Sequence, residues 1–233
     1  MNQFCLAIVV ASFALLSRAD ANEIPATWPR LDSHRATTAI VVATVAAGAA
    51  LPTLDECKRK DVICLHTPFW FTADVREPLS GQVPGAPLHV ATLSHYGLES
   101  FAEDPAPRLM LLKVVDGQVV MPINAWMLLS IRRDGELFLV DKGYSLPDWL
   151  PCSTPQLREP VVESDFDPAV GAKRDGDAGK FEDFSVRSHP DAWHVTNNHS
   201  FPRAGIRVTR LRELIHDLAA AGEPTTCPRS EPN

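Results

Sequence analysis

The first half of the chain has the hydrophobic patterns of β-strands. Residues 37–47 read TTAIVVATVAA, apolar and β-branched without a break, which predicts a buried strand. Residues 68–75 alternate instead, which predicts a half-buried strand with Phe69 on its covered face and Trp70 on the other. A third strand is predicted over residues 88–95, after the turn-rich stretch SGQVPGAP.

Two Asp-Gly pairs between apolar runs predict tight hairpins. Asp116-Gly117 stands in VVDGQVV, and Asp134-Gly135 stands in IRRDGELFLV. Asp-Gly suits a two-residue turn in which both residues have positive φ, and strands joined by such a turn are antiparallel. Residues 36–142 are therefore predicted to form an antiparallel β core without a helix between 106 and 141.

The composition changes after this core. Residues 143–183 are rich in proline and then acidic, which predicts a long loop, mobile in part. Within residues 184–222 we expect two short strands, at 184–186 and 193–196, followed by a helix that packs on the core. Residues 223–233 are expected to be a tail.

The helix is predicted from its cap, its apolar stripe and its stop signal. Thr209 is the expected N-cap, and Gly222 ends the helix after Ala221. The stripe has the spacing i, i+3, i+4, i+7 and consists of Leu211, Leu214, Ile215 and Leu218.

These elements predict a mainly β protein: an OB-like antiparallel barrel or sandwich with one C-terminal amphipathic helix. Pro, at 20 residues where about 12 are usual, disfavours a helical bundle.

The stretch Ala36–Asp141 opens with the strand AIVVATV and ends with the hairpin AWMLLSIRRDGELFLV. In strand order and turn placement it resembles the OB-fold-like domains of small exported bacterial proteins. It is more distantly similar to netrin-like modules, which include the tissue inhibitors of metalloproteases. Those inhibitors depend on a cysteine at or near the mature N-terminus, whereas the first cysteine of the mature chain expected here is Cys57. The resemblance therefore does not imply inhibition.

The N-terminus has the features of a secretory signal. Residues 4–17 read FCLAIVVASFALLS, without a charge and too short for an ordinary transmembrane helix of about 20 residues. An Ala-x-Ala site ends at Ala21, so residues 1–21 are interpreted as a cleaved signal peptide and Asn22 as the mature N-terminus. An uncleaved anchor is the alternative, because residues 1–3 carry no Lys or Arg. A short polar lead, residues 22–35, follows.

Removal of the signal takes one of the five cysteines, Cys5, and leaves four in an exported chain, which indicates disulfides. Three pairings are possible, and we favour Cys57–Cys64 with Cys152–Cys227. The first would close a short charged loop, and the second would hold the tail against the proline-rich loop. A zinc site is the alternative, but the spacings match no known finger.

Charge and motifs exclude some functions. The chain has 29 acidic and 22 basic residues, a formal charge of −7, which argues against nucleic-acid binding. No motif for a P-loop, a dinucleotide site or a zinc protease occurs, so no cofactor is predicted. Gly143-Tyr144-Ser145 begins a nucleophile elbow, but Pro147 stands where a glycine is required.

Three histidines near the C-terminus are candidate metal ligands. His189, His194 and His199 recur every five residues, and Asp191 lies among them. Imidazoles beside a carboxylate can bind zinc or copper. A spacing of five follows neither face of a strand nor of a helix, so polar histidines without a metal are the favoured alternative.

Trp70 and His95 are the candidate residues of a binding surface. Trp70 is expected to face away from the phenylalanines of its strand, and a second layer of core is the favoured place for it, with a binding surface as the alternative.

From these features the chain is predicted to be an exported, non-enzymatic module, periplasmic or secreted, that binds an unidentified protein or envelope component and retains no transmembrane segment. One alternative is an envelope hydrolase with a histidine–carboxylate or metal site. The other is a periplasmic metal-binding protein.

Overall fold

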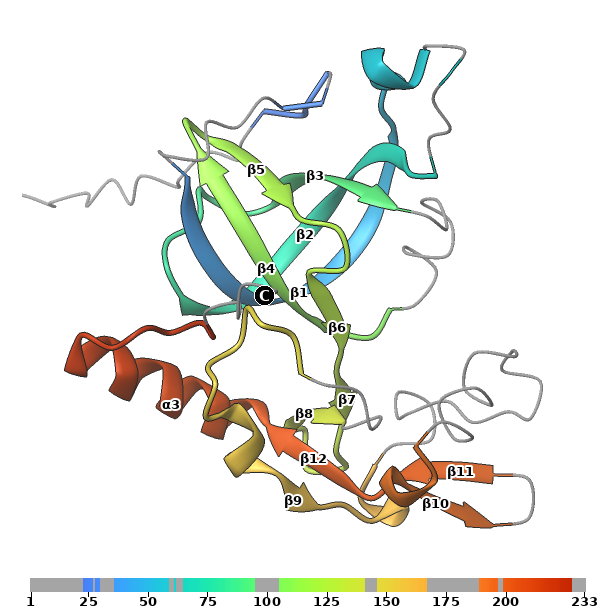
Figure 1. The fold of residues 1–233 in the computed structure, drawn as a ribbon, viewed down its shortest axis with the longest axis vertical. Helices are drawn as coiled ribbons and strands as arrows, with labels where there is room; N and C mark the ends of the chain where they lie inside the picture. The colour runs from blue at the N-terminus through green and yellow to red at the C-terminus, as the bar shows by residue number, and fades with distance from the viewer. Residues whose placement is uncertain are drawn as a thin grey trace, which may run out of the picture.

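The computed structural model describes residues 23–26, 28–29, 36–58, 61, 65–94, 105–140, 146–166, 189–196 and 199–227. The described residues form a mainly β protein in which a closed barrel stands on a second layer (Figure 1). The barrel strands are β1 (Thr37–Ala50), β2 (Thr67–Ser80), β3 (Leu88–Ser94), β4 (Arg108–Val115) and β5 (Gln118–Met121). A short 3-10 helix, η1 (Asp55–Lys58), lies between β1 and β2.

The five strands pair in the order β1-β2-β3-β5-β4, and a further pairing of β1 with β4 closes the barrel. All of these pairs are antiparallel except β3–β5, in which Val90, Ala91 and Thr92 run parallel to residues 119–121. The prediction of a β-barrel with a C-terminal helix is thus confirmed, and the prediction that it is antiparallel throughout is wrong at this pair. The Thr92 hydroxyl donates to the Met121 carbonyl and reinforces that junction.

The middle of β1 is apolar because both of its faces are covered there. Residues 39–43 are at most 1% exposed. Opposed residues share a face of a sheet, so Ile40 and its β4 partner Leu111 lie on the face opposite to Val41 and its partner Met110. All four belong to one hydrophobic cluster that continues into the second layer.

The second layer has its own sheet and a hairpin. The sheet runs in the order β7 (Ser130–Ile131), β8 (Leu137–Val140), β12 (Ala204–Arg207), β9 (Glu159–Pro160). The hairpin consists of β10 (Trp193–Thr196) and β11 (His199–Pro202), and β10 has the bounds predicted for that strand. β6 (Trp126–Leu128) pairs with β4 and leads from the barrel into the second layer. The predicted core of residues 36–142 is therefore divided, because β7 and β8 pair outside the barrel.

The helix of the second layer is α3 (Val208–Ala221), the one α-helix among the described residues. It buries Val208, Leu211 and Ile215 in the main core. Arg212 on its barrel side pairs with Glu77 of β2. The predicted stop is confirmed, since Gly222 has φ 71. The predicted start is wrong by two residues: Arg207 is the N-cap, and the Thr209 hydroxyl instead donates to Glu136.

The two Asp-Gly turns differ. Asp116 and Gly117 both have positive φ, 48 and 78, and join β4 to β5 as the two-residue turn predicted. At the second turn only Gly135 has positive φ, 87, so the prediction for Asp134 is wrong. The Gly135 amide donates to the Arg132 carbonyl and the Arg132 amide to the Glu136 carbonyl, which describes a three-residue loop with a glycine bulge.

Part of the predicted long loop is packed. Residues 146–166 include η2 (Thr154–Leu157) and η3 (Glu163–Asp165), and they bury Trp149, Leu150 and Val161. The predicted Cys152–Cys227 disulfide joins this segment to the chain after α3. The Cys227 amide also donates to the carbonyls of Asp148 and Leu150.

Other predictions concern residues that the description does not cover. Cys57 is disulfide-bonded, but Cys64, its predicted partner, lies outside the described residues, so that pairing stays a prediction. Residues 1–21, the strand at 184–186 and the acidic end of the loop, residues 167–183, also lie outside them.

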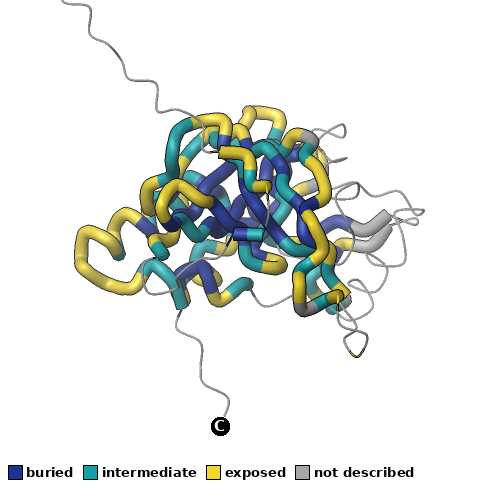
Figure 2. Tube along the Cα trace, turned by 90° about the horizontal axis from the view of Figure 1, so that it is seen from above, coloured by how far each residue is buried: buried dark blue, intermediate teal, exposed yellow. Residues whose placement is uncertain are grey.

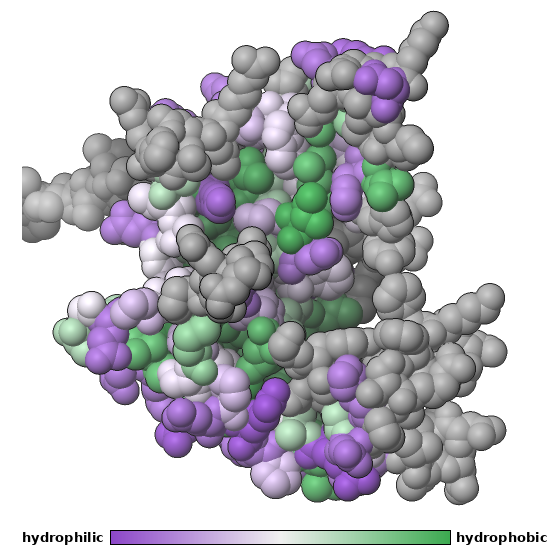
Figure 3. Space-filling view, viewed as in Figure 1, coloured by the Kyte–Doolittle hydropathy of each residue, from purple (hydrophilic) through white to green (hydrophobic). Residues whose placement is uncertain are grey.

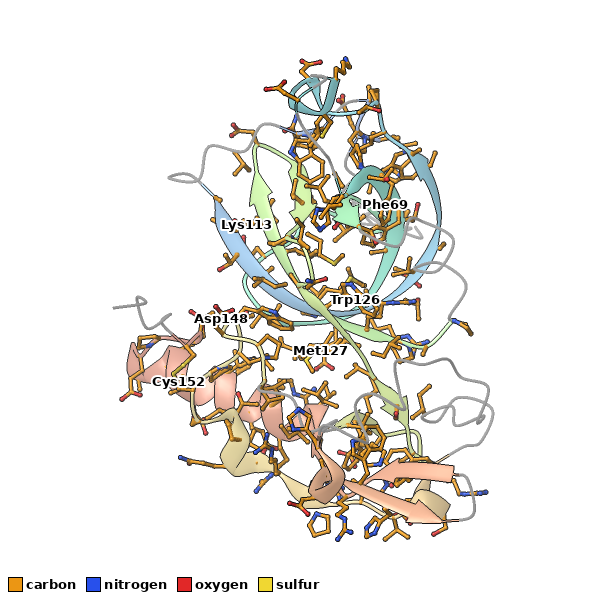
Figure 4. All side chains as sticks on the ribbon, turned by 45° about the vertical axis from the view of Figure 1, so that its right-hand side comes forward. Phe69, Lys113, Trp126, Met127, Asp148 and Cys152 are labelled. Carbon is orange, nitrogen blue, oxygen red and sulfur yellow. A yellow bond between two sulfur atoms is a disulfide. The ribbon has the colours of Figure 1, made fainter. Side chains whose placement is uncertain are left out.

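Buried segments gather in the middle of the molecule and exposed segments surround them (Figure 2). Trp126 and Met127 of β6 pack against the main core where the barrel meets the second layer (Figure 4). In the described part of the chain, no helix has the length and hydrophobicity that a bilayer crossing requires.

Candidate functional site

An apolar row crosses the outside of the barrel at Trp70. Trp70 of β2 is paired with Ala91 of β3, and Ala91 is paired with Val120 of β5. Since paired residues share a face, these three side chains lie on one line around the barrel. The line continues to Lys113 of β4, which is half-buried, and to Thr38 of β1, which is exposed. The inward neighbours of Trp70, Phe69 and Phe71, are buried in the barrel, as the alternation predicted.

A bulge in β1 shapes one end of this row. Ala46 is paired with Thr72 and Ala49 with Trp70, so two residues of β1 oppose the single residue Phe71. One of the two is Gly48, where an added Cβ would collide with the carbonyl group of Trp70. Glycine therefore allows the β1 backbone to approach Trp70 closely.

The row belongs to an apolar cluster, and we call its strand and loop residues, Leu51, Trp70, Ala91 and Val120, the tryptophan face. Trp28 packs against this cluster. Ala91 is 0% exposed and Val120 6% exposed although both lie outside the barrel. Trp28 comes from the N-terminal lead, which passes beside β5 and β3 (Figure 1). In Figure 3 hydrophobic side chains gather among polar ones on the side of the barrel turned to the viewer.

His89 adds a polar ring to the tryptophan face. It lies on β3 diagonally from Trp70, and the two rings meet edge to face with centroids 5.5 Å apart. Lys113 of β4, labelled in Figure 4, is paired with Val120 of β5. Trp70 is thus in a second apolar layer outside the barrel, while its proposed companion His95 lies outside the described residues.

The C-terminal histidines occupy the β10–β11 region. His194 is exposed on β10, on the side opposite to the buried Trp193. His189 precedes η4 (Pro190–Ala192), and His199 begins β11, where its backbone pairs with Thr196. The side chain of His199 is not described. No group of three or more potential metal ligands occurs among the described side chains, and the metal site stays a prediction.

A charged network ties the second layer together. Arg207 donates to Glu159 and to Glu136, at 2.7 Å in each case. The hydrogen bond to Glu159 raises the pKa of Arg207 above its ordinary value, and the charge of Glu136 adds to this effect. Arg207 and Arg132 both lie over the ring of Phe138, at 5.3 and 5.5 Å from its centroid. A guanidinium held by two carboxylates and a ring suits a structural role.

Arg108 is a second cation with an unusual position. It is 1% exposed at the start of β4, donates to the Ala106 carbonyl and lies 5.6 Å from the centroid of the Trp126 ring. A buried arginine held by a carbonyl and an aromatic ring supports the junction of β4 with β6.

Of these groups, the tryptophan face offers the clearest chemistry for recognition. Its indole and imidazole rings lie beside the buried side chains of Ala91 and Val120, an arrangement that suits the binding of an apolar or aromatic group. The described site residues hold no nucleophile paired with a base. Comparisons with known protein families, with curated proteins and with solved structures found no match to this chain.

Sequence reasoning missed Ala91 and Val120 as parts of this face and Trp28 as a residue that packs against it. The signal that could have found Trp28 is a large apolar residue within an otherwise polar lead. Ala91 and Val120 carry no such signal, because only the pairing of β3 with β5 places them beside Trp70.

Proposed function

We propose that this protein is an exported, non-enzymatic binding module that binds a protein or envelope component through the tryptophan face. The observation that carries the proposal is the apolar row Trp70–Ala91–Val120 on the outside of a closed barrel. A barrel buries its core inside, so outward positions of the strands need no apolar residues for closure.

The barrel itself supports this use. We propose that it is OB-like, since five strands that follow the order β1-β2-β3-β5-β4 and close through β1–β4 form a Greek-key barrel. In OB-folds the face of the second and third strands is a common binding surface. Trp70, His89 and Ala91 lie on the corresponding strands here.

Export is part of the proposal. The apolar stretch and Ala-x-Ala site of residues 1–21 support a cleaved signal peptide. The Cys152–Cys227 disulfide supports an oxidising compartment, the periplasm or the exterior, because such bonds are rare where thiols are kept reduced.

Site-specific crosslinking tests the proposed face. A photoreactive amino acid replaces Thr72, which lies two residues from Trp70 on the same side of β2. In cells that make the protein naturally, we expect a discrete adduct from Thr72 that disappears when Trp70→Ala is added. The control is the same amino acid at Arg210, which is exposed on α3.

No adduct at Thr72 would contradict the proposal. An adduct that forms equally at Arg210, or that survives Trp70→Ala, would contradict the tryptophan face as the binding surface.

A further inference from the structure

The tryptophan face already holds a short piece of chain. Trp28 packs against Leu51, Ala91 and Val120, and the next residue, Pro29, is buried. We propose that this face is a peptide-binding surface occupied by the protein's own lead, and that its partner is an extended segment carrying tryptophan followed by proline. The inference rests on the proposed function and specifies the ligand of that face.

The apolar side chains of the face are suited to a large aromatic ring. Ala91 leaves room at the middle of the row, and the larger side chains of Trp70 and Leu51 belong to the same cluster. Ala91 is 0% exposed, and Trp28 packs against the cluster that contains it. Large flat rings in such pockets commonly dominate the affinity of an interface.

Within the described part of the lead, the contact with the face is made by Trp28. Ile24, four residues before Trp28, is 54% exposed, whereas Pro29 is buried. The described residues of the lead pair with no strand, so side chains rather than a β-ladder hold it. This mode of attachment allows the lead to leave without opening the barrel.

Two prolines restrict the conformation of the lead and so favour this contact. A residue before proline is restricted to extended conformations, which applies to Trp28 before Pro29 and to Ile24 before Pro25. An extended segment that is already restricted loses less conformational entropy when it docks. A partner with the same Trp-Pro sequence would share this advantage.

Covalent attachment makes the lead a competitor. Residues 30–35 connect it to the beginning of the barrel, and short linkers give effective concentrations in the millimolar range. A segment tethered at about 1 mM lowers the apparent affinity of a free peptide with a Kd of about 0.1 mM roughly tenfold. Only partners that bind tightly or are locally concentrated therefore displace the lead from the face.

The test uses the whole chain and a peptide with the sequence of residues 23–29, EIPATWP, labelled at its N-terminus. Fluorescence anisotropy is measured with wild-type protein and with Trp28→Ala, whose own lead no longer competes. We expect saturable binding to Trp28→Ala and binding about tenfold weaker to the wild type. The matched variant Ile24→Ala, altered at an exposed position of the same segment, should bind the peptide as the wild type does.

Two further measurements locate the binding. A peptide in which alanine replaces tryptophan should not bind, and the double variant Trp28→Ala/Trp70→Ala should lose the peptide. Circular dichroism establishes that the variants are folded. If Trp28→Ala does not fold, the peptide is titrated against the wild type and against Trp70→Ala, and saturable binding to the wild type alone is expected.

Absence of binding to folded Trp28→Ala, or equal binding to the double variant, overturns the inference. In the wild-type titration, absence of binding or equal binding to Trp70→Ala does the same. These results can be distinguished from failure of the proposed function. If an adduct at Thr72 depends on Trp70 but no peptide binds, the face remains a binding surface and Trp-Pro segments are excluded as its ligand.

Discussion

The barrel and the second layer are held together in different ways. In the barrel, each of five strands is hydrogen-bonded to two neighbours, and the interior is apolar. In the second layer the strands have two to four residues, and cross-links join distant parts of the chain: the Cys152–Cys227 disulfide and the bonds from Arg207 to Glu136 and Glu159.

The difference indicates two sources of stability. Because the barrel is closed, each of its strands is hydrogen-bonded along both edges. The stability of the barrel therefore depends chiefly on how well its interior is filled. Short strands bury little, so the second layer depends on its links and on the aromatic cluster Phe138, Phe166 and Phe201. Both regions share the main hydrophobic core, which couples them.

The largest effect is expected inside the barrel. Phe71 is 0% exposed, and Phe71→Ala should lower the free energy of unfolding by about 3–5 kcal/mol, because it removes a buried ring and leaves a cavity. Denaturant unfolding measures the change. Thr72→Ala, at the next residue on the outer side, is the control and should cost about 1 kcal/mol or less. Similar losses for the two variants would show that the barrel interior is not the main source of stability.

The disulfide tests the second layer. Replacing Cys152 and Cys227 by serine should lower the free energy of unfolding by about 2–4 kcal/mol, because the open chain gains conformational entropy when it unfolds. Hydrogen exchange should quicken first in residues 146–157 and the end of α3, with β1–β5 remaining protected. Equal acceleration in the barrel amides would mean that the two regions open as one unit.

The smallest expected effect compares the same substitution in each region. Gly117 closes a barrel hairpin and Gly135 a hairpin of the second layer, both have positive φ, and a Cβ would meet no atom within 4 Å at either. Substitution by alanine should therefore lower the free energy of unfolding only through backbone strain, by about 1 kcal/mol at each position. Thermal unfolding checks this, with exposed Gln118→Ala as the control. If one glycine variant loses much more stability than the other, its hairpin contributes more to the stability of its region.

Local patterns predicted part of the candidate site. Alternation in residues 68–75 placed Trp70 opposite to Phe69 and Phe71, because side chains in a strand change sides at every residue. The contact with Trp28 could not be predicted in this way. It joins Trp28 to Leu51, Ala91 and Val120, which follow it by 23, 63 and 92 positions and come from the segment after β1, from β3 and from β5.

The sequence by itself determined the elements that depend on neighbours in the chain: the strands from hydrophobic pattern, the Asp116-Gly117 turn from its chemistry, and the end of α3 from Gly222. Only the tertiary structure decided that β3 pairs parallel with β5, that β7 and β8 leave the barrel, and that Trp28 of the lead packs against Leu51, Ala91 and Val120. The reason is physical. Turns and caps are set by a few adjacent residues, whereas contacts such as Arg207 with Glu136, 71 residues apart, depend on the folding of everything between them.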